Sequence, residues 1–264
     1  MNIVTKNYRY LIILILIITL FYLLYQYSLK FYNYYFFKRY GYLIIHEGIS
    51  DKDCNDIFLV INKELGSVDN EYTWNEKYRK NLRVPVESEI KTVINKILNN
   101  HNLEKIWETF TPNAILAESS IFLSYPKAGN QPWHRDIELK DDYANMITIG
   151  IALDDIDEEM GPLELYSKSM DIPDKLLVKL KDKYNNNYLE NLKYKKKKFI
   201  CKKGSIVIWN SKIIHRGSEN FSNTIRPLFY FSFLEGDKPM QQGPTYSLKS
   251  NYKHKIYINE LNNN

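Results

Sequence analysis

The hydrophobic pattern begins with one long apolar stretch near the amino terminus. Residues 10–29 carry no charge, and residues 11–18 are all Leu or Ile. A helix rises 1.5 Å per residue, so 20 residues reach about 30 Å, the thickness of the hydrocarbon layer of a bilayer. Aromatic residues crowd positions 22–37, as at a membrane interface. The pattern predicts a single membrane-spanning anchor with a juxtamembrane aromatic segment in residues 1–38.

A cleaved signal peptide is the alternative interpretation of this stretch. The apolar run is long for a signal peptide, and no Ala-x-Ala-like site follows it, which favours an uncleaved anchor. The flanking charges do not give its orientation, since Lys6 and Arg9 on one side balance Lys30, Lys38 and Arg39 on the other. The sequon at Asn220 lies close to a candidate site residue, so it does not report the compartment. We therefore expect a single-pass membrane protein of undetermined sidedness.

The polar and apolar positions after the anchor predict a strand at 41–45 and then helices. Capping oxygens and acidic residues at 50–53 precede a helix with Ile57, Phe58 and Ile61 at helical spacing. Residues 87–99 carry a second apolar stripe, and residues 172–188 a third helical pattern. These stripes are packing surfaces rather than sites.

From residue 114 the pattern changes to short β-branched or aromatic runs separated by glycine and proline. The runs are 115–125, 146–153, 162–166, 205–210 and 225–234. Many short strands at modest spacing favour a sandwich or barrel. We predict a mainly β fold with flanking helices (α+β), a double-stranded β-helix of the jelly-roll or cupin-like kind. One domain would span 39–264, with its core at about 114–235.

Composition and charge add little. The formal net charge is +5, and much of the excess lies in Lys193, Lys195 to Lys198, Lys202 and Lys203. This cluster reads as a solvated loop, or less strongly as a surface for an anionic membrane or substrate. It lacks an aromatic-interleaved basic groove, so we expect no nucleic-acid partner. Two cysteines, Cys54 and Cys201, are too few for a disulfide framework. Two unpaired thiols are expected, although a single bridge stays open.

Candidate chemistry lies in two distant segments. His134-Arg135-Asp136 forms a His-x-Asp, and His215 follows 81 positions later (215 − 134). On an extended strand, residues i and i+2 share one face, so such a strand presents an imidazole and a carboxylate together. A second histidine from another strand would complete a 2-His-1-carboxylate triad, the ligand set of non-heme Fe(II) oxygenases. His46, His101 and His254 lack such a setting.

Five segments in order resemble the phytanoyl-CoA dioxygenase family of Fe(II)- and 2-oxoglutarate-dependent oxygenases. They are Trp133-His134-Arg135-Asp136, then 151–155, then 158–163 with Gly161-Pro162, then 203–209 ending in Trp209, and finally 215–220 followed by Arg226. The resemblance covers roughly residues 120–235. It implies iron ligands at His134, Asp136 and His215, with no catalytic side chain beyond them. It also implies that Arg226 binds the distal carboxylate of 2-oxoglutarate.

A guanidinium suits that role, because it meets a carboxylate through two parallel hydrogen bonds and stays charged when partly buried. The resemblance implies an oxidoreductase that uses Fe(II), 2-oxoglutarate and O2. It would hydroxylate its substrate while 2-oxoglutarate is decarboxylated to succinate. Asp136 disfavours a halogenase, which needs a small residue there.

The substrate and the oligomeric state stay open. Membrane tethering raises lipids, fatty acyl groups and membrane-associated glycans as candidates, besides other small molecules. A protein side-chain hydroxylase of the same cofactor class is the runner-up. A membrane-anchored binding protein without turnover is the rival from another class.

Overall fold

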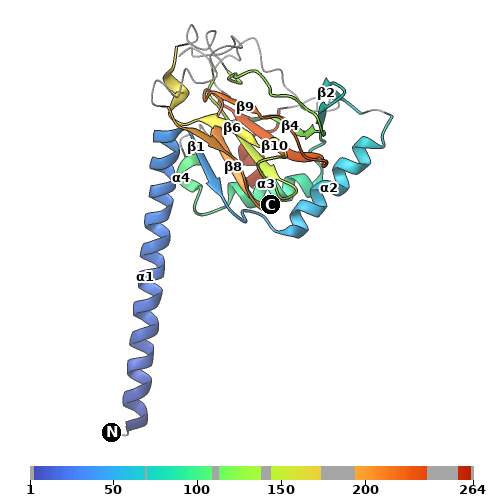
Figure 1. Ribbon diagram of the computed structural model, residues 1–264. Coiled ribbons are helices and arrows are strands. Elements are labelled where there is room, and N and C mark those ends of the chain that lie inside the picture. The colour runs from blue at the N-terminus through green and yellow to red at the C-terminus, as the bar shows by residue number, and fades with distance from the viewer. Residues whose placement is uncertain are drawn as a thin grey trace.

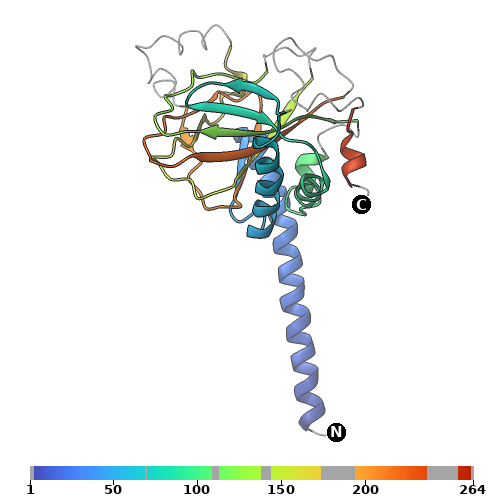
Figure 2. The ribbon, with the colours of Figure 1, turned by 90° about the vertical axis from the view of Figure 1, so that its right-hand side faces the viewer.

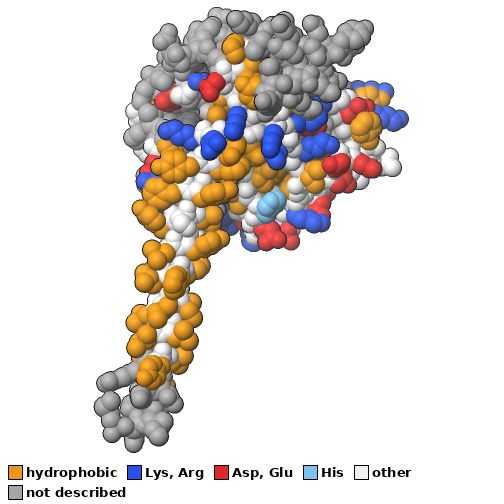
Figure 3. Space-filling model, turned by 60° about the vertical axis from the view of Figure 1, so that its left-hand side comes forward, with side chains coloured by type: hydrophobic (Ala, Val, Ile, Leu, Met, Phe, Trp, Pro, Cys, Tyr) orange, Lys and Arg blue, Asp and Glu red, His pale blue; other side chains and the backbone are white. Residues whose placement is uncertain are grey.

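The computed structural model describes residues 3–68, 70–108, 113–137, 144–173, 194–236 and 255–262. A single long helix, α1 (Ile3–Tyr40), leads into a β-rich domain (Figure 1). The helix projects away from the domain, and hydrophobic side chains cover the face of its free part that Figure 3 shows. Within the described residues it is the one helix long and apolar enough to cross a membrane, over Tyr10–Tyr40.

The domain is built on a seven-stranded antiparallel sheet with the order β1-β8-β5-β10-β4-β3-β2. Long β10 is at its centre, paired along most of its length with β4 on one side and β5 on the other. The strands of this large sheet are β1 (Tyr42–Ile45), β2 (Tyr72–Asn75), β3 (Arg79–Arg83), β4 (Ile115–Ser124), β5 (Met146–Ala152), β8 (Ile206–Asn210) and β10 (Arg226–Leu234).

A second, three-stranded antiparallel sheet has the order β7-β6-β9. Its strands are β6 (Leu163–Tyr166), β7 (Lys196–Lys198) and β9 (His215–Gly217). Two antiparallel sheets with flanking helices agree with the predicted mainly β, jelly-roll-like architecture.

Alternation along the central strands separates a packing face from a pocket face. Phe229, Phe231 and Phe233 of β10 join the main hydrophobic core with α2 (Asp51–Leu65) and α3 (Ser88–Leu98). The two helices lie side by side along this face (Figure 2). Leu228, directly before Phe229, and Tyr230, between Phe229 and Phe231, point the other way and line a pocket. A strand alternates its side chains, so one sequence of nine residues serves both faces.

Local sequence explains where α2 begins. The hydroxyl of Ser50 accepts a hydrogen bond from the backbone of Asp53, and the Asp53 carboxylate accepts one from the backbone of Ser50. This capping box satisfies two amides that a helix start leaves unpaired. The shorter elements are α4 (Glu104–Trp107), the 3-10 turn η1 (Ser169–Asp171) and α7 (Ile258–Asn262).

The last third of α1 is part of the domain. Lys30 forms an ion pair with Glu104 of α4 and is 9% exposed. Asn33 donates to the carbonyl of Asn102 at 3.2 Å, and Phe37 enters the main core. Basic side chains gather on the domain near this end of the helix (Figure 3). The helix therefore continues from its exposed apolar part into the packed domain without a linker.

Several predictions need correction. The strands β2 and β3 were not predicted. Lys196–Lys198, read as a loop, form the exposed edge strand β7, where lysines protect against pairing with other chains. His134 makes an isolated bridge and Asp136 lies in a bend, so His-x-Asp is not on a regular strand. Most of the predicted helix at 172–188, together with Lys193 and His254, lies outside the described residues.

Candidate metal centre

Two backbone hydrogen bonds hold the two candidate histidines opposite each other. The amide of His134 donates to the carbonyl of His215 at 3.0 Å, and the amide of His215 donates back at 2.9 Å. The two residues form an antiparallel bridge between the segment 131–137 and β9. Directly opposed residues project to the same side of a ladder, and the ring centres lie 4.4 Å apart.

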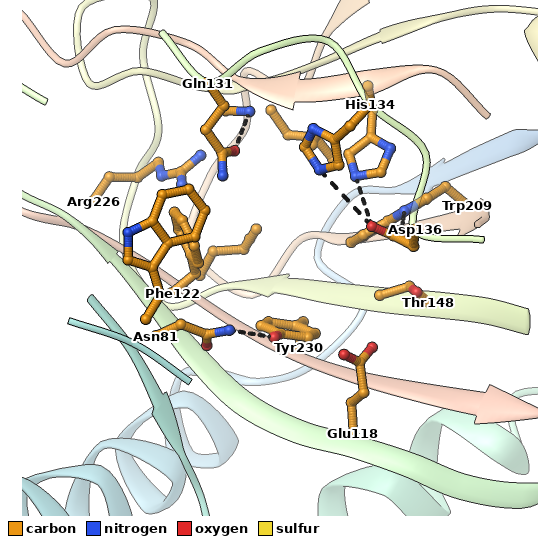
Figure 4. A pocket seen from close by; sticks show the side chains of 15 residues that line it. Asn81, Glu118, Phe122, Gln131, His134, Asp136, Thr148, Trp209, Arg226 and Tyr230 are labelled. Carbon is orange, nitrogen blue, oxygen red and sulfur yellow. Dashed lines mark hydrogen bonds and ion pairs between the residues drawn. The ribbon is translucent and has the colours of Figure 1, made fainter. Parts of the chain in front are cut away.

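Asp136 joins this pair. Its amide donates to the carbonyl of Ser211 at 3.0 Å, which bends the segment after His134. Its Oδ1 lies 3.3 Å from Nε2 of His215 and 3.9 Å from Nε2 of His134. One ligand atom from each of the three residues falls within 4.8 Å of the other two. The structure thus brings together all three residues that the sequence predicts as ligands (Figure 4).

Neighbouring groups prepare each side chain for metal binding. Nδ1 of His134 lies 2.9 Å from the carbonyl of Pro132, and Nδ1 of His215 lies 3.1 Å from that of Ile213. A carbonyl accepts, so each Nδ1 carries the proton and each Nε2 keeps its lone pair for a metal. The indole nitrogen of Trp209 donates to Oδ2 of Asp136 at 3.2 Å, which leaves Oδ1 for the ion. This donor set fits a divalent iron ion.

The electrostatics of the triad favour ionised Asp136. Burial opposes its charge, but the adjacent His215 and His134 and the Trp209 hydrogen bond hold the pKa of Asp136 below its ordinary value. Burial likewise opposes a charge on His215, yet Asp136 raises its pKa overall. A metal cation would replace the proton on His215 as the charge that offsets this carboxylate.

Arg226, the first residue of β10, is 2% exposed in the same pocket. Its Nη1 donates to the carbonyl of Gly161 at 2.8 Å, while its buried Nε has no partner. Among the described residues, no carboxylate forms an ion pair with it. Burial and the nearby Arg79 lower the pKa of Arg226 to about 9. A buried guanidinium in this setting fits an anionic ligand.

Gly161 shapes the support of that arginine. Its φ is +73°, and a Cβ there would come within 2.6 Å of the carbonyl oxygen of Ser218. Only glycine takes this conformation at no steric cost. A second guanidinium, Arg79, is 5% exposed and donates to the carbonyls of Gly129 and Ser218. The chain therefore keeps two buried cations at one end of the pocket.

The pocket holds about 200 Å³ and contains side chains that the motifs did not indicate. His134, Asp136 and Arg226 lie on its upper side in Figure 4, and Glu118, Tyr230 and Asn81 on its lower side. Glu118 of β4 and Asn81 of β3 belong to no recognisable motif, so no spacing rule in the sequence reveals them. The other lining residues are Trp74, Phe122, Gln131, Thr148, Leu163, Trp209, Gly217 and Leu228.

The arginines beside the ligands make contacts away from the metal centre, and Arg216 does so as alternation along β9 predicts. Arg135 donates to the carbonyls of Ser169 and Ile172. The Nε of Arg216 donates to Glu164 at 2.8 Å, and its guanidinium lies 4.3 Å from the ring centre of Trp133. These contacts hold the β-scaffold around the site.

Two further sequence features have a structural explanation. Both cysteines are unpaired and buried, as predicted. Asn220 is 1% exposed, and its Nδ2 donates to the carbonyls of Ser124 and Thr224 at 2.8 and 2.9 Å. An amide nitrogen held in this way is not accessible for glycosylation, so the sequon carries no information about compartment.

Comparison with known proteins agrees with this geometry. No curated protein sequence matches the chain. Among solved structures, the carbocyclase SnoK from nogalamycin biosynthesis, described as non-heme and alpha-ketoglutarate-dependent, is similar with a TM-score of 0.62 and 14% identity, covering 80% of this chain and 87% of its own. HygX from Streptomyces hygroscopicus, solved with nickel and 2-oxoglutarate, is similar with a TM-score of 0.57 and 15% identity. The match covers 86% of this chain and 94% of HygX.

The epimerase SnoN, solved with Fe3+, alpha-ketoglutarate and nogalamycin RO, gives a TM-score of 0.61 at 11% identity, covering 79% of this chain and 84% of its own. At these identities the similarity shows a shared fold. The model of the phytanoyl-CoA dioxygenase family matches residues 37–228, more than two thirds of the chain. The chain therefore belongs to the phytanoyl-CoA dioxygenase family of non-heme iron, 2-oxoglutarate-dependent oxygenases.

Proposed function

We propose that this protein is a membrane-anchored hydroxylase that acts on a small molecule, with His134, Asp136 and His215 holding Fe(II) and Arg226 binding 2-oxoglutarate. The observation that carries the proposal is the convergence of the three ligand atoms in one pocket with a buried arginine. Iron bound there supplies O2 activation coupled to oxidative decarboxylation of 2-oxoglutarate to succinate and CO2.

The chain's own residues position the reactants. Carbonyls of Pro132 and Ile213 fix the histidine tautomers, and Trp209 fixes the Asp136 carboxylate. Arg226 offers a guanidinium to the distal carboxylate of the cosubstrate, and the carbonyl of Gly161 keeps that guanidinium in place. Water is kept out by apolar walls such as Leu163, Phe122 and Leu228.

The anchor proposal rests on α1. Its side chains from Leu11 to Leu24 are exposed and almost all apolar, a surface that water does not favour. A bilayer around this stretch would bury it. We propose that the catalytic domain spans 39–264 and is attached to a membrane by residues 1–38.

The test is succinate formation from 2-oxoglutarate by the full-length protein in detergent micelles with Fe(II). Polar metabolite and lipid extracts are supplied as substrates, and mass spectrometry follows products that gain one oxygen atom from 18O2. Asp136→Ala should abolish both signals, while Asp154→Ala, at an exposed turn, should leave them intact.

Equal turnover by wild type and Asp136→Ala would refute the metal centre. Metal-dependent 2-oxoglutarate binding without any oxygenated product would favour the non-catalytic binding protein. Oxygen gain in an added peptide rather than in the extracts would favour the side-chain hydroxylase.

A further inference from the structure

A row of polar side chains crosses the large sheet at the inner end of the pocket. Ser232 of β10 lies opposite Glu118 of β4 on one side and Thr148 of β5 on the other. Ser232 donates to the Glu118 carboxylate, and its hydroxyl lies 3.0 Å from that of Thr148. Thr148 also contacts the hydroxyl of Ser211 at 2.9 Å. Three hydroxyls therefore hold this end of the pocket in a defined geometry.

This row and Arg226 occupy opposite ends of one strand. Ser232 follows Arg226 by six positions in β10, which corresponds to roughly 20 Å along a strand. The metal centre lies between the two ends. Trp209, which binds Asp136, has its ring against Gly150, and Gly150 pairs with Tyr230, midway between Ser232 and Leu228. If 2-oxoglutarate extends from the metal to Arg226, the end of the pocket at Glu118 stays open for the substrate.

The two ends carry opposite charge. Arg226 lines one end and has the charge of Arg79 close to it, whereas the carboxylate of Glu118 points from β4 into the other end, toward Tyr230 and Thr148 (Figure 4). We propose that Glu118 binds a protonated amine of the substrate, so that the reaction acts on an ammonium-bearing small molecule. This inference rests on the proposed function and names the substrate class for the same pocket.

The chemistry around Glu118 suits an ammonium group. A carboxylate only accepts hydrogen bonds, has about four acceptor positions, and an ammonium offers three donors. The ring of Tyr230 lines the same pocket close to this carboxylate, and the face of an aromatic ring attracts cations. The Tyr230 hydroxyl accepts a hydrogen bond from Asn81 at 2.7 Å, which fixes this ring beside the carboxylate.

Burial keeps Tyr230 neutral. Its removal from water, and then the charge of Glu118, raise the pKa of this phenol. Tyr230 therefore adds no negative charge, and the carboxylate that faces it at this end of the pocket is that of Glu118 (Figure 4). A purely apolar substrate would strip water from that carboxylate without giving a donor in return, which is unfavourable. The ammonium could belong to a soluble amine or to an amine-bearing lipid headgroup, and the experiment separates these sources.

The experiment measures binding to the full-length protein in detergent micelles, loaded with Mn(II) and 2-oxoglutarate. The soluble probes are ethanolamine, glucosamine and spermidine, and the lipid probe is sphingosine. Each is compared with its fully N-acetylated counterpart, which has no ammonium group and is larger by one acetyl group per amine. Affinity is taken from the concentration dependence of the melting temperature.

We expect at least one amine to bind about tenfold more tightly than its N-acetyl counterpart, the factor that a hydrogen-bonded charge provides. In Glu118→Gln this preference should disappear. Glu118→Asp, which keeps the charge, should retain part of it, and Glu89→Gln, on the exposed side of α3, should retain all of it. A preference limited to sphingosine assigns the group to a lipid, and one limited to the other probes to a soluble amine.

Wild-type protein that prefers no amine over its N-acetyl counterpart would overturn the inference, even if Glu118→Gln does not fold. A preference that persists in a folded Glu118→Gln protein would overturn it as well. Mn(II)-dependent binding of 2-oxoglutarate is measured in parallel. If the wild-type protein does not bind 2-oxoglutarate, the proposed function itself is contradicted. If it binds 2-oxoglutarate but prefers no amine, only the role of Glu118 is contradicted.

Discussion

The indole nitrogen of Trp209 lies 3.2 Å from Oδ2 of Asp136. Trp209 belongs to β8, which is paired with β1 on one side and β5 on the other, while Asp136 sits in a bend without regular secondary structure. The hydrogen bond therefore fixes the orientation of the Asp136 carboxylate relative to the sheet. Gly150 makes room for the indole, because a Cβ at that position would lie 3.1 Å from the ring.

Trp209→Phe should weaken metal binding without removing a ligand. The phenyl ring keeps most of the packing but has no N–H for Asp136, so the carboxylate loses its orientation. Loss of such a supporting partner typically costs 10- to 100-fold in metal affinity, and we expect about that loss. Titration with Mn(II) in the presence of 2-oxoglutarate measures it. Trp107→Phe is the matched control. This tryptophan lies in α4 and packs against the main hydrophobic core, so the variant should bind Mn(II) as wild type does.

Arg226→Lys should weaken 2-oxoglutarate binding while metal binding persists. Lysine keeps a positive charge but cannot form two parallel hydrogen bonds to a carboxylate. Hydrogen bonds to charged groups contribute about 1.5–3 kcal/mol, so the dissociation constant should rise about 10- to 100-fold. Isothermal calorimetry with Mn(II)-loaded protein gives both constants. Arg83→Lys, whose guanidinium pairs with Glu71, should leave them unchanged; an unchanged affinity in Arg226→Lys would exclude this arginine from the cosubstrate site.

The two thiols should resist alkylation in the native state. Burial raises the pKa of Cys54 to about 11 and that of Cys201 to about 12. A raised thiol pKa means that the proton stays on sulfur up to higher pH, so at pH 8 roughly one thiol in a thousand or fewer is the reactive thiolate. Mass spectrometry after iodoacetamide treatment at pH 8 should find neither cysteine modified until denaturant is added. Labelling of either one in folded protein would contradict this burial.

The anchor predicts resistance to alkaline extraction. Full-length protein expressed in cells should stay with the membranes after carbonate treatment, and its appearance in the soluble fraction would refute a spanning helix. Replacing Ile15 and Leu16 together by Asp should release it, since each central Asp costs about 2.5–3.5 kcal/mol in membrane insertion. The same two replacements at Tyr32 and Tyr35, exposed beyond the apolar stretch, serve as the control and should not release it.

Strands with a clear apolar pattern were predictable from the sequence almost to the residue. Residues 146–153 and 225–234 correspond to β5 and β10, because buried central strands need β-branched or aromatic residues throughout. The strands β2 and β3, the last two at one end of the large sheet, were missed. Their sequences, such as Arg-Lys-Asn-Leu-Arg in β3, are mostly polar, since one side of an edge pair faces water or the pocket. Tertiary pairing with β4, rather than local preference, makes them strands.

The candidate site divides in the same way. His134, Asp136 and His215 were predictable because metal ligands must be of certain types and follow a family spacing. Glu118 and Asn81 were not, because side chains that recognise a particular substrate follow no common pattern. They come together only through the strand register that places Glu118 opposite Ser232. Residues that recognise the substrate can therefore be identified from the three-dimensional structure but not from a sequence motif.

The continuity of α1 has a mechanical consequence. Lys30, Asn33 and Phe37 fasten one end of the helix to the domain, and no hinge separates that end from the apolar stretch. In a bilayer that surrounds this stretch, the helix and the domain would move as one rigid body, so the domain would tilt and rotate only together with α1. The entrance of the pocket would then stay at a constant height above the lipid, and only reactants that visit this layer would be sampled.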